Sequence, residues 1–144
     1  MALRKVRISK AKIAMLQLRS AIQLFNKREY VSSITLAGAA DEILSQLAFK
    51  NRGHNTLGGE KYFWDSFASM YNKPQPSKDK IRRLNNRIKN NLKHHDANAD
   101  LHVEADFEFE AQSLIDSAIR NYWIAFDSAP KDRIVTNYVN WQWT

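Results

Sequence analysis

Hydrophobic residues recur at alternating steps of three and four along two segments near the amino terminus. The first segment runs from Ile8 to about Asn26, and the second starts near Glu29 and has a broad apolar face. Such spacing places apolar side chains on one face of an α-helix. The centre of the second segment is a run of small residues, 37–40, which would let a neighbouring helix approach closely. The pattern predicts two amphipathic helices, and the short connection between them predicts antiparallel neighbours.

Three further helices are predicted downstream. Residues 50–59 hold three of the chain's four glycines and indicate a loop. An aromatic helix over 62–71 follows and ends before Pro74, and a fourth helix follows Ser77. The apolar residues of the fourth helix are Ile81, Leu84, Ile88 and Leu92. Acidic residues crowd the start of a fifth helix, where the helix dipole favours negative charge, and its apolar stripe extends to Phe126.

The carboxyl-terminal tail has a different pattern. After Pro130, Val139, Trp141 and Trp143 alternate with polar residues, a period of two that predicts an extended arm over 131–144. Tryptophans at a chain end seldom stay in water, so the arm is expected to pack on the bundle or on a partner subunit. The sequence as a whole predicts one domain, 1–144, with an all-α fold: an up-and-down helical bundle of four to five helices with an extended aromatic C-terminal arm.

Composition narrows the class of protein. The chain has no cysteine, which excludes disulfides and thiolate chemistry and agrees with a reducing, cytoplasmic setting. No apolar run approaches the roughly 20 residues that cross a bilayer, so no membrane partner is expected. The net charge of +7 is unevenly spread: residues 1–28 hold eight Lys or Arg and no acid, whereas residues 96–127 hold eight acids and only Arg120. The basic elements can attract RNA or another polyanion, or can pack beside the acidic helix.

The fourth predicted helix carries the candidate chemistry. Arg87 and His94 are seven residues apart, on one face and roughly 10 Å from each other. Arginine offers a planar fork to phosphate oxygens, and histidine moves a proton near neutral pH. For RNA, His94 would deprotonate the ribose 2′-OH or protonate the leaving oxygen, while Arg87 would stabilise the charge that builds on phosphorus. The scheme requires neither a metal nor an organic cofactor.

Neighbouring residues complete this candidate site. The expected phosphate or base contacts are Asn91, Lys93, His95 and Arg83. At roughly 10 Å, one arginine and one histidine do not easily serve one phosphate, so a second copy of the helix across a two-fold axis would complete the site, and a homodimer is expected. The sequence favours a surface or capping role for Asp41 and Glu42 of the second helix; the alternative is that one of them orients a site residue.

This arrangement resembles the HEPN superfamily of small helical-bundle proteins. Its ribonuclease members carry an arginine, four to six residues and then a histidine, and six residues separate Arg87 from His94. The segment NNLKHHD is similar to the family's N-x-x-K-H form through Asn90, Lys93 and His94, and LAGAADEIL (36–44) looks like the preceding core helix. The likeness covers residues 8–127. One departure is Ile88, where active members often have a polar residue; it bears on cleavage rather than on the fold.

The resemblance implies a function and partners. It implies a metal-independent endoribonuclease, or a non-catalytic RNA-binding module, of the kind used in toxin–antitoxin and phage-defence systems. A cognate antitoxin or a nucleotidyltransferase-type protein is the partner that it suggests.

Two other interpretations compete with the ribonuclease. In an HD-type metal phosphohydrolase, the pair His95-Asp96 would combine with His54 and with Asp116 or Asp127. In a non-catalytic interaction module, the basic helices would dock RNA or an acidic partner, and the aromatic tail would hold an oligomer together.

Overall fold

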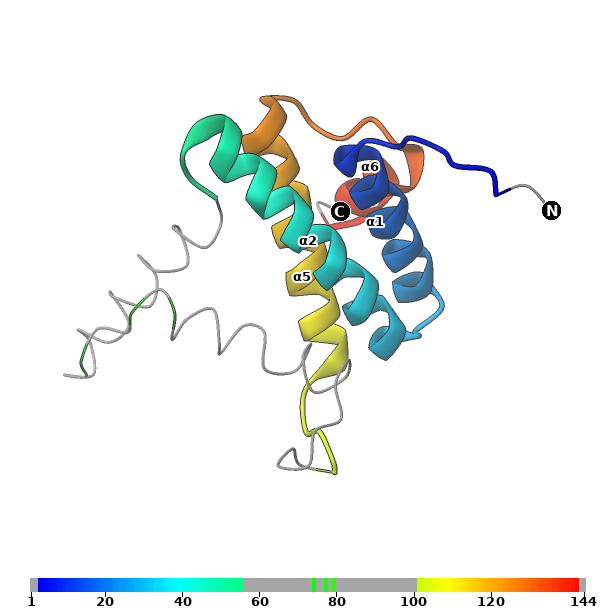
Figure 1. The fold of residues 1–144 in the computed structure, drawn as a ribbon. Helices are drawn as coiled ribbons and strands as arrows, with labels where there is room; N and C mark the ends of the chain where they lie inside the picture. Colours follow the sequence, from blue (N-terminus) through cyan, green and yellow to red (C-terminus); the bar gives the residue numbers. More distant parts are fainter. Residues whose placement is uncertain (1–2, 56–73, 75–76, 78, 80–100, 143–144) are drawn as a thin grey trace.

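The computed structural model describes residues 3–55, 74, 77, 79 and 101–142 of the 144-residue chain. Four long helices lie in these residues: α1 (Lys10–Asn26), α2 (Tyr30–Arg52), α5 (Phe107–Phe126) and α6 (Arg133–Gln142). They pack as a bundle, and none of the described residues forms a strand (Figure 1). The predicted all-α class is therefore confirmed. The predicted third and fourth helices fall almost entirely outside the described residues.

Helices α1 and α2 form the antiparallel pair that the sequence predicts (Figure 1). Ser9 caps α1, because its Oγ accepts a hydrogen bond from the Lys12 amide at 3.1 Å. The chain then reverses over residues 27–29, where Arg28 adopts a left-handed φ of 63°. Inside the pair, the buried Ser33 hydroxyl donates to the Ala21 carbonyl at 2.7 Å. This bond satisfies a hydroxyl that would otherwise be costly to bury.

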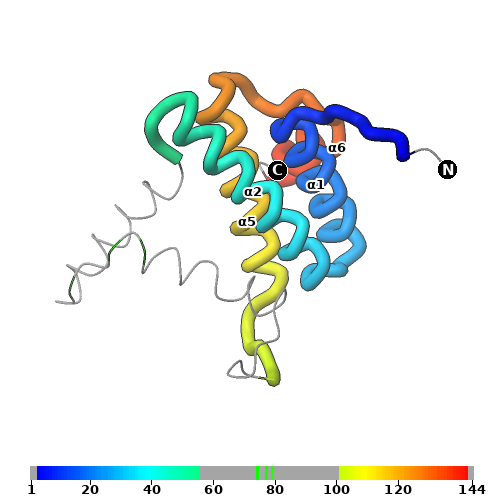
Figure 2. The backbone as a smooth tube through the Cα atoms, in the orientation of Figure 1, coloured from blue at the N-terminus to red at the C-terminus, as the bar shows by residue number. Residues whose placement is uncertain are grey.

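Helix α5 packs against α2, its most extensive neighbour among the described helices (Figure 2). Small residues on both helices are buried, which allows their backbones to approach: Ala37, Gly38 and Ala40 on α2, and Ala111, Ala118 and Ala125 on α5. The carboxyl ends of α2 and α5 lie together, since the Asn51 side chain donates to the Ala125 carbonyl at 3.0 Å. The predicted close approach to the small-residue run of α2 thus occurs.

The four helices share one apolar core. Its largest fully buried apolar side chains are Leu18, Ile22, Ile34, Leu44, Ile115 and Val135. These residues come from all four described helices, so no helix can be removed without exposing apolar surface to water. None of these helices is long and apolar enough to span a membrane.

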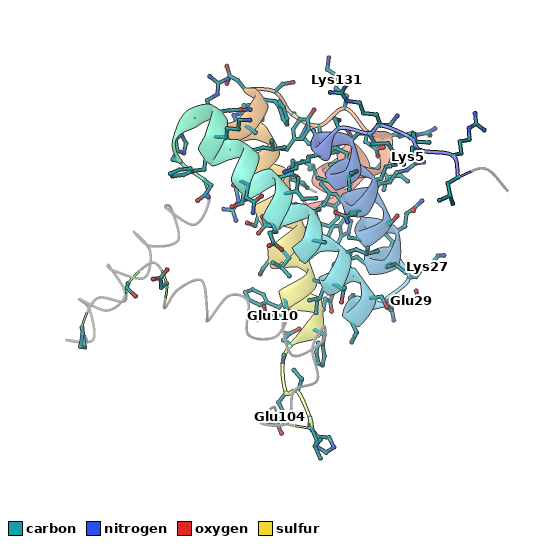
Figure 3. The ribbon with its side chains drawn as sticks, viewed as in Figure 1. Lys5, Lys27, Glu29, Glu104, Glu110 and Lys131 are labelled. Atoms are coloured by element: carbon teal, nitrogen blue, oxygen red, sulfur yellow. The ribbon has the colours of Figure 1, made fainter. Side chains whose placement is uncertain are left out.

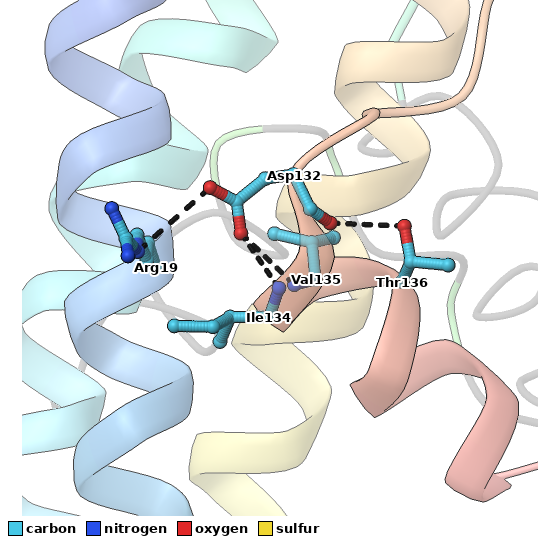
Figure 4. Close-up of polar contacts among 5 residues, drawn as sticks. All are labelled: Arg19, Asp132, Ile134, Val135 and Thr136. Atoms are coloured by element: carbon cyan, nitrogen blue, oxygen red, sulfur yellow. Dashed lines mark hydrogen bonds and ion pairs between the residues drawn. The ribbon is translucent and has the colours of Figure 1, made fainter.

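The extended C-terminal arm was a wrong prediction, because Arg133–Gln142 form helix α6. The Asp132 carboxylate caps this helix by accepting hydrogen bonds from the amides of Ile134 and Val135 at 2.9 and 3.3 Å (Figure 4). Val135 and Tyr138, three residues apart, are both buried. The helical spacing of these core residues, together with the cap, outweighs the period of two formed by Val139, Trp141 and Trp143.

The expected packing of the aromatic tail on the bundle is confirmed for Trp141. Its ring lies edge-on to Phe25 of α1, with ring centroids 6.1 Å apart, and Tyr138 contacts the same phenylalanine at 5.8 Å. Arg19 of α1 also lies 3.8 Å from the Asp132 carboxylate (Figure 4). Helix α6 is thus held against α1 of its own chain by both apolar and charged groups.

Candidate functional site

The predicted site on the fourth helix lies outside the described residues. This applies to both proposed catalytic residues, Arg87 and His94, and to the proposed RNA contacts Arg83, Asn91, Lys93 and His95. The described residues do contain the acidic pair of α2 that was considered as a second contribution to the site. They also contain two polar clusters and a pronounced separation of charge.

Asp41 joins α2 to α5. Its Oδ1 accepts a hydrogen bond of 2.8 Å from the Nδ2 of Asn121, whose side chain is fully buried. A carboxylate that accepts from a buried amide forms a charge-assisted bond and is fixed in position. Asp41 therefore acts as a bridge inside the bundle, whereas the neighbouring Glu42 is exposed. The structure assigns Asp41 neither the surface role nor the capping role that the sequence favoured.

Asn121 was missed by the sequence interpretation, although a signal for it exists. It stands three residues after Ala118 and four before Ala125, both of which are buried on α5. An asparagine at a core position of an apolar stripe needs a hydrogen-bond partner when it is buried. That need predicts a polar residue on the facing helix, a role that Asp41 fills.

A second polar cluster connects α5 to α6. Asp116 accepts a hydrogen bond from the Tyr138 hydroxyl at 3.0 Å, and Gln142 Nε2 donates to both of its oxygens at 2.9 and 3.2 Å. Burial, followed by the charge of Asp116 and its hydrogen bond, raises the pKa of the Tyr138 phenol well above its ordinary value. The cluster therefore contains a carboxylate that binds helix α6 and a tyrosine that stays protonated.

This cluster bears on the metal-dependent alternative. Asp116 was one of its nominated ligands, yet both oxygens of this carboxylate accept hydrogen bonds from α6. Within the part of the chain that the structure describes, no three or more His, Cys, Asp or Glu residues come together in a way that could hold a metal ion. The pair His95-Asp96 lies outside that part.

Charge is separated between the two ends of the bundle. Lys5 and Lys131 lie at one end, and Glu104 and Glu110 lie at the other (Figure 3). We define the basic end by seven exposed residues: Arg4, Lys5, Arg7, Lys10, Lys12, Lys131 and Arg133. The acidic end consists of Glu104, Asp106, Glu108 and Glu110. The basic segments of the sequence thus bring positive charge together at one end of the folded chain, which attracts polyanions there, while Lys27 lies beside Glu29 at the opposite end of α1 (Figure 3).

The acidic end also has local structural roles. Asp106 caps α5 by accepting a hydrogen bond from the Phe109 amide at 3.0 Å. Burial, and secondly repulsion from Asp106, raises the pKa of Glu110. These carboxylates lie at the positive end of the α5 dipole, as the sequence predicts.

Comparisons of the chain with models of known protein families, with characterised proteins and with solved structures found no match.

Proposed function

We propose that the chain is a HEPN-like helical-bundle protein that acts as a metal-independent endoribonuclease, with Arg87 and His94 as its catalytic residues. The observation that carries the proposal is the motif itself: an arginine, six residues and a histidine, overlapping an N-x-x-K-H form within a basic segment. The setting is a cytoplasmic toxin–antitoxin or defence system. The partner is a cognate antitoxin or a nucleotidyltransferase-type protein.

The bundle supports this proposal in two ways. Its class is all-α, as the resemblance requires. The segment 36–44, which resembles the core helix that precedes the motif, lies in α2, where Ala37, Ala40 and Leu44 are fully buried. A helix with this degree of burial is a rigid part of the bundle.

The proposed reaction is transesterification of RNA. His94 takes the proton of a ribose 2′-OH, and the resulting oxygen attacks the adjacent phosphorus. The bond from phosphorus to the 5′-oxygen breaks, that oxygen takes up a proton from water, and the protonated His94 then returns its proton to the solvent. The products are a 2′,3′-cyclic phosphate and a 5′-hydroxyl end. Arg87 binds a non-bridging phosphate oxygen and stabilises the charge of the transition state.

The remaining residues of the proposed site bind the substrate. Arg83, Asn91, Lys93 and His95 contact neighbouring phosphates or bases. A homodimer would bring Arg87 of one copy and His94 of the other to the same phosphate, which their spacing along a single helix does not do.

The test compares three substitutions in the same segment. His94→Ala should lower the rate of RNA cleavage by at least about a hundredfold, the usual contribution of a general acid or base. Arg87→Ala should lower it by at least about a hundredfold as well, the usual cost of removing a group that stabilises charge in the transition state. Lys89→Ala removes a positive charge from the same segment and is the matched control, so it should change the rate only a few-fold. Equal losses for Lys89→Ala and His94→Ala would contradict a catalytic role for His94. Circular dichroism of each variant checks that the fold is intact.

A second candidate is a non-catalytic RNA-binding module. Ile88 favours it, because active members of the family often have a polar residue after the motif arginine. This candidate predicts RNA binding that weakens gradually as basic residues are removed and that falls with salt, without cleavage by the wild-type chain.

A further inference from the structure

The amino-terminal segment, residues 3–8, runs away from the bundle (Figures 1 and 2). It lies outside any helix and ends at Ser9, whose φ and ψ of −66° and 150° are extended. Leu3 and Val6 are 93% and 72% exposed. No hydrogen bond or ion pair joins these six residues to the rest of the described chain. The backbone and side chains of this segment are therefore available to order on a partner.

The charge of this segment continues onto the bundle. Arg4, Lys5 and Arg7 lie on the segment, and Lys10 and Lys12 follow in the first turn of α1. The connection between α5 and α6 adds further cations, because the contact of Asp132 with Arg19 at 3.8 Å places the neighbouring residues beside α1. These cations are Lys131 and Arg133, and both are exposed.

Acidic groups do little to neutralise this surface. Asp132 lies within it, but its carboxylate already faces Arg19 and caps α6 (Figure 4). The four carboxylates of the acidic end lie at the far end of the bundle, where Figure 3 shows Glu104 and Glu110. The basic end therefore keeps an excess of positive charge that is available to a polyanion.

The distribution of apolar residues distinguishes between polyanions. Apolar and basic residues are interleaved along the segment: Leu3, Val6 and Ile8 are separated by Arg4, Lys5 and Arg7. A membrane-surface element separates an apolar face from a basic one. The segment lacks that separation, because its cations are interleaved with its apolar residues, and this suits a flexible phosphate backbone.

We propose that the basic end binds the phosphate backbone of single-stranded RNA and that residues 3–8 order along it. This inference rests on the proposed RNA-directed function. It adds a binding surface that is separate from the residues assigned to chemistry. The contacts are made to phosphates, so the surface holds RNA without reading its sequence.

The test measures binding of a short uridine oligomer with 2′-O-methyl groups, labelled with fluorescein, by fluorescence anisotropy across a range of potassium chloride concentrations. The methyl groups remove the nucleophile of the proposed reaction, so the wild-type chain can be used without cleavage. The variant of the amino-terminal segment, which we call the arm variant, is Arg4→Gln/Lys5→Gln/Arg7→Gln. The control, Lys27→Gln/Lys50→Gln/Arg120→Gln, removes the same charge from three exposed positions: one directly after α1, one on α2 and one on α5.

The expected effect follows from counterion release. Each phosphate contact on a single strand contributes about 0.7 to the slope of log affinity against log salt, so three lost contacts should lower the slope by about 2. With equal affinities for wild type and variant at about 1 M salt as the reference, this change of slope makes the variant bind about 50-fold more weakly at about 0.15 M salt. The control variant should weaken binding only a few-fold and keep the wild-type slope.

Equal weakening by the two variants would overturn the inference, because net charge alone would then explain binding. Loss of binding to phosphatidylserine vesicles in the arm variant, without loss of RNA binding, would also overturn it and point to a lipid surface. The proposed reaction is tested separately. If the wild-type chain never cleaves RNA but binding depends on residues 4, 5 and 7, the endoribonuclease proposal fails and this inference stands. If cleavage depends on His94 but the arm variant binds RNA as tightly as the wild type, the endoribonuclease proposal stands and this inference fails.

Discussion

Replacing Tyr138 with phenylalanine removes one hydroxyl from the contact between α5 and α6 and keeps the ring. The hydroxyl donates to Asp116 at 3.0 Å, and the residue is only 3% exposed. A hydrogen bond to a charged group contributes about 1.5–3 kcal/mol to stability. Asp116 keeps its bonds to Gln142 in the variant, so the free energy of unfolding at neutral pH should fall by about 1.5 kcal/mol, the lower limit.

The same contact makes this difference depend on pH. Because the pKa of Tyr138 is raised in the folded chain, the unfolded chain releases the phenolic proton first, above about pH 10. The stability that the group contributes is therefore fully present below about pH 10 and is lost above it, at up to about 1.4 kcal/mol per pH unit. Between about pH 10 and pH 11, the wild-type chain should lose about 1 kcal/mol more than Tyr138→Phe.

The assay is urea unfolding followed by circular dichroism at a series of pH values. Tyr30→Phe is the matched control, since the Tyr30 hydroxyl makes no hydrogen bond within the described residues, and this variant should follow the wild-type profile. The difference between wild type and Tyr138→Phe should narrow above about pH 10. A difference that stays constant with pH, or none at neutral pH, would refute the placement of Tyr138 against Asp116.

Two further predictions concern the frame that supports the site. Leu44→Ala creates a cavity at a fully buried position of α2 and should lower the free energy of unfolding by about 2–5 kcal/mol. Thermal unfolding measures this loss beside that of Leu16→Ala, which changes an exposed leucine. Equal losses of stability in the two variants would contradict the packing of Leu44. Asp106→Ala removes the cap of α5 and should cost about 1 kcal/mol in urea unfolding. Asp106→Asn can still accept the Phe109 amide and should recover most of that loss, so equal destabilisation by both substitutions would argue against the cap.

Sequence periodicity predicted three of the four described helices well. Helices α1 and α2 begin within two residues of their expected starts, and α5 ends at the expected Phe126. These helices have long apolar stripes, and periodicity is a strong signal over such lengths. The antiparallel α1–α2 pair also follows from the sequence, because the connection is too short for another arrangement.

Helix α6 shows where this reasoning failed. Over about ten residues, Val139, Trp141 and Trp143 fit a period of two, while Val135 and Tyr138 fit a helix. The deciding contacts are distant in sequence: Phe25 packs on Tyr138, and Asp116 accepts from its hydroxyl. A local pattern does not contain these partners, so tertiary packing chose the helix.

The hydrogen bond between Asp41 of α2 and Asn121 of α5 could not be predicted from local sequence either. The sequence drew attention to Asp41, but its partner Asn121 is eighty residues away. The distribution of charge was easier to predict from the sequence, because the residues of a short run of like charge stay together wherever the segment lies in the fold. The separation into a basic and an acidic end was therefore implicit in the sequence, whereas the pairing of Asp41 was not.

The central claim, a metal-independent ribonuclease that uses His94, is tested most directly by the chemistry of the RNA ends. Purified wild-type chain and His94→Ala are incubated with mixed single-stranded and structured RNA in excess EDTA, and the fragments are analysed for 2′,3′-cyclic phosphate. The account predicts fragments with this end from the wild-type chain and none from the variant. Intact RNA with the wild-type chain, or equal cleavage by His94→Ala, would contradict it.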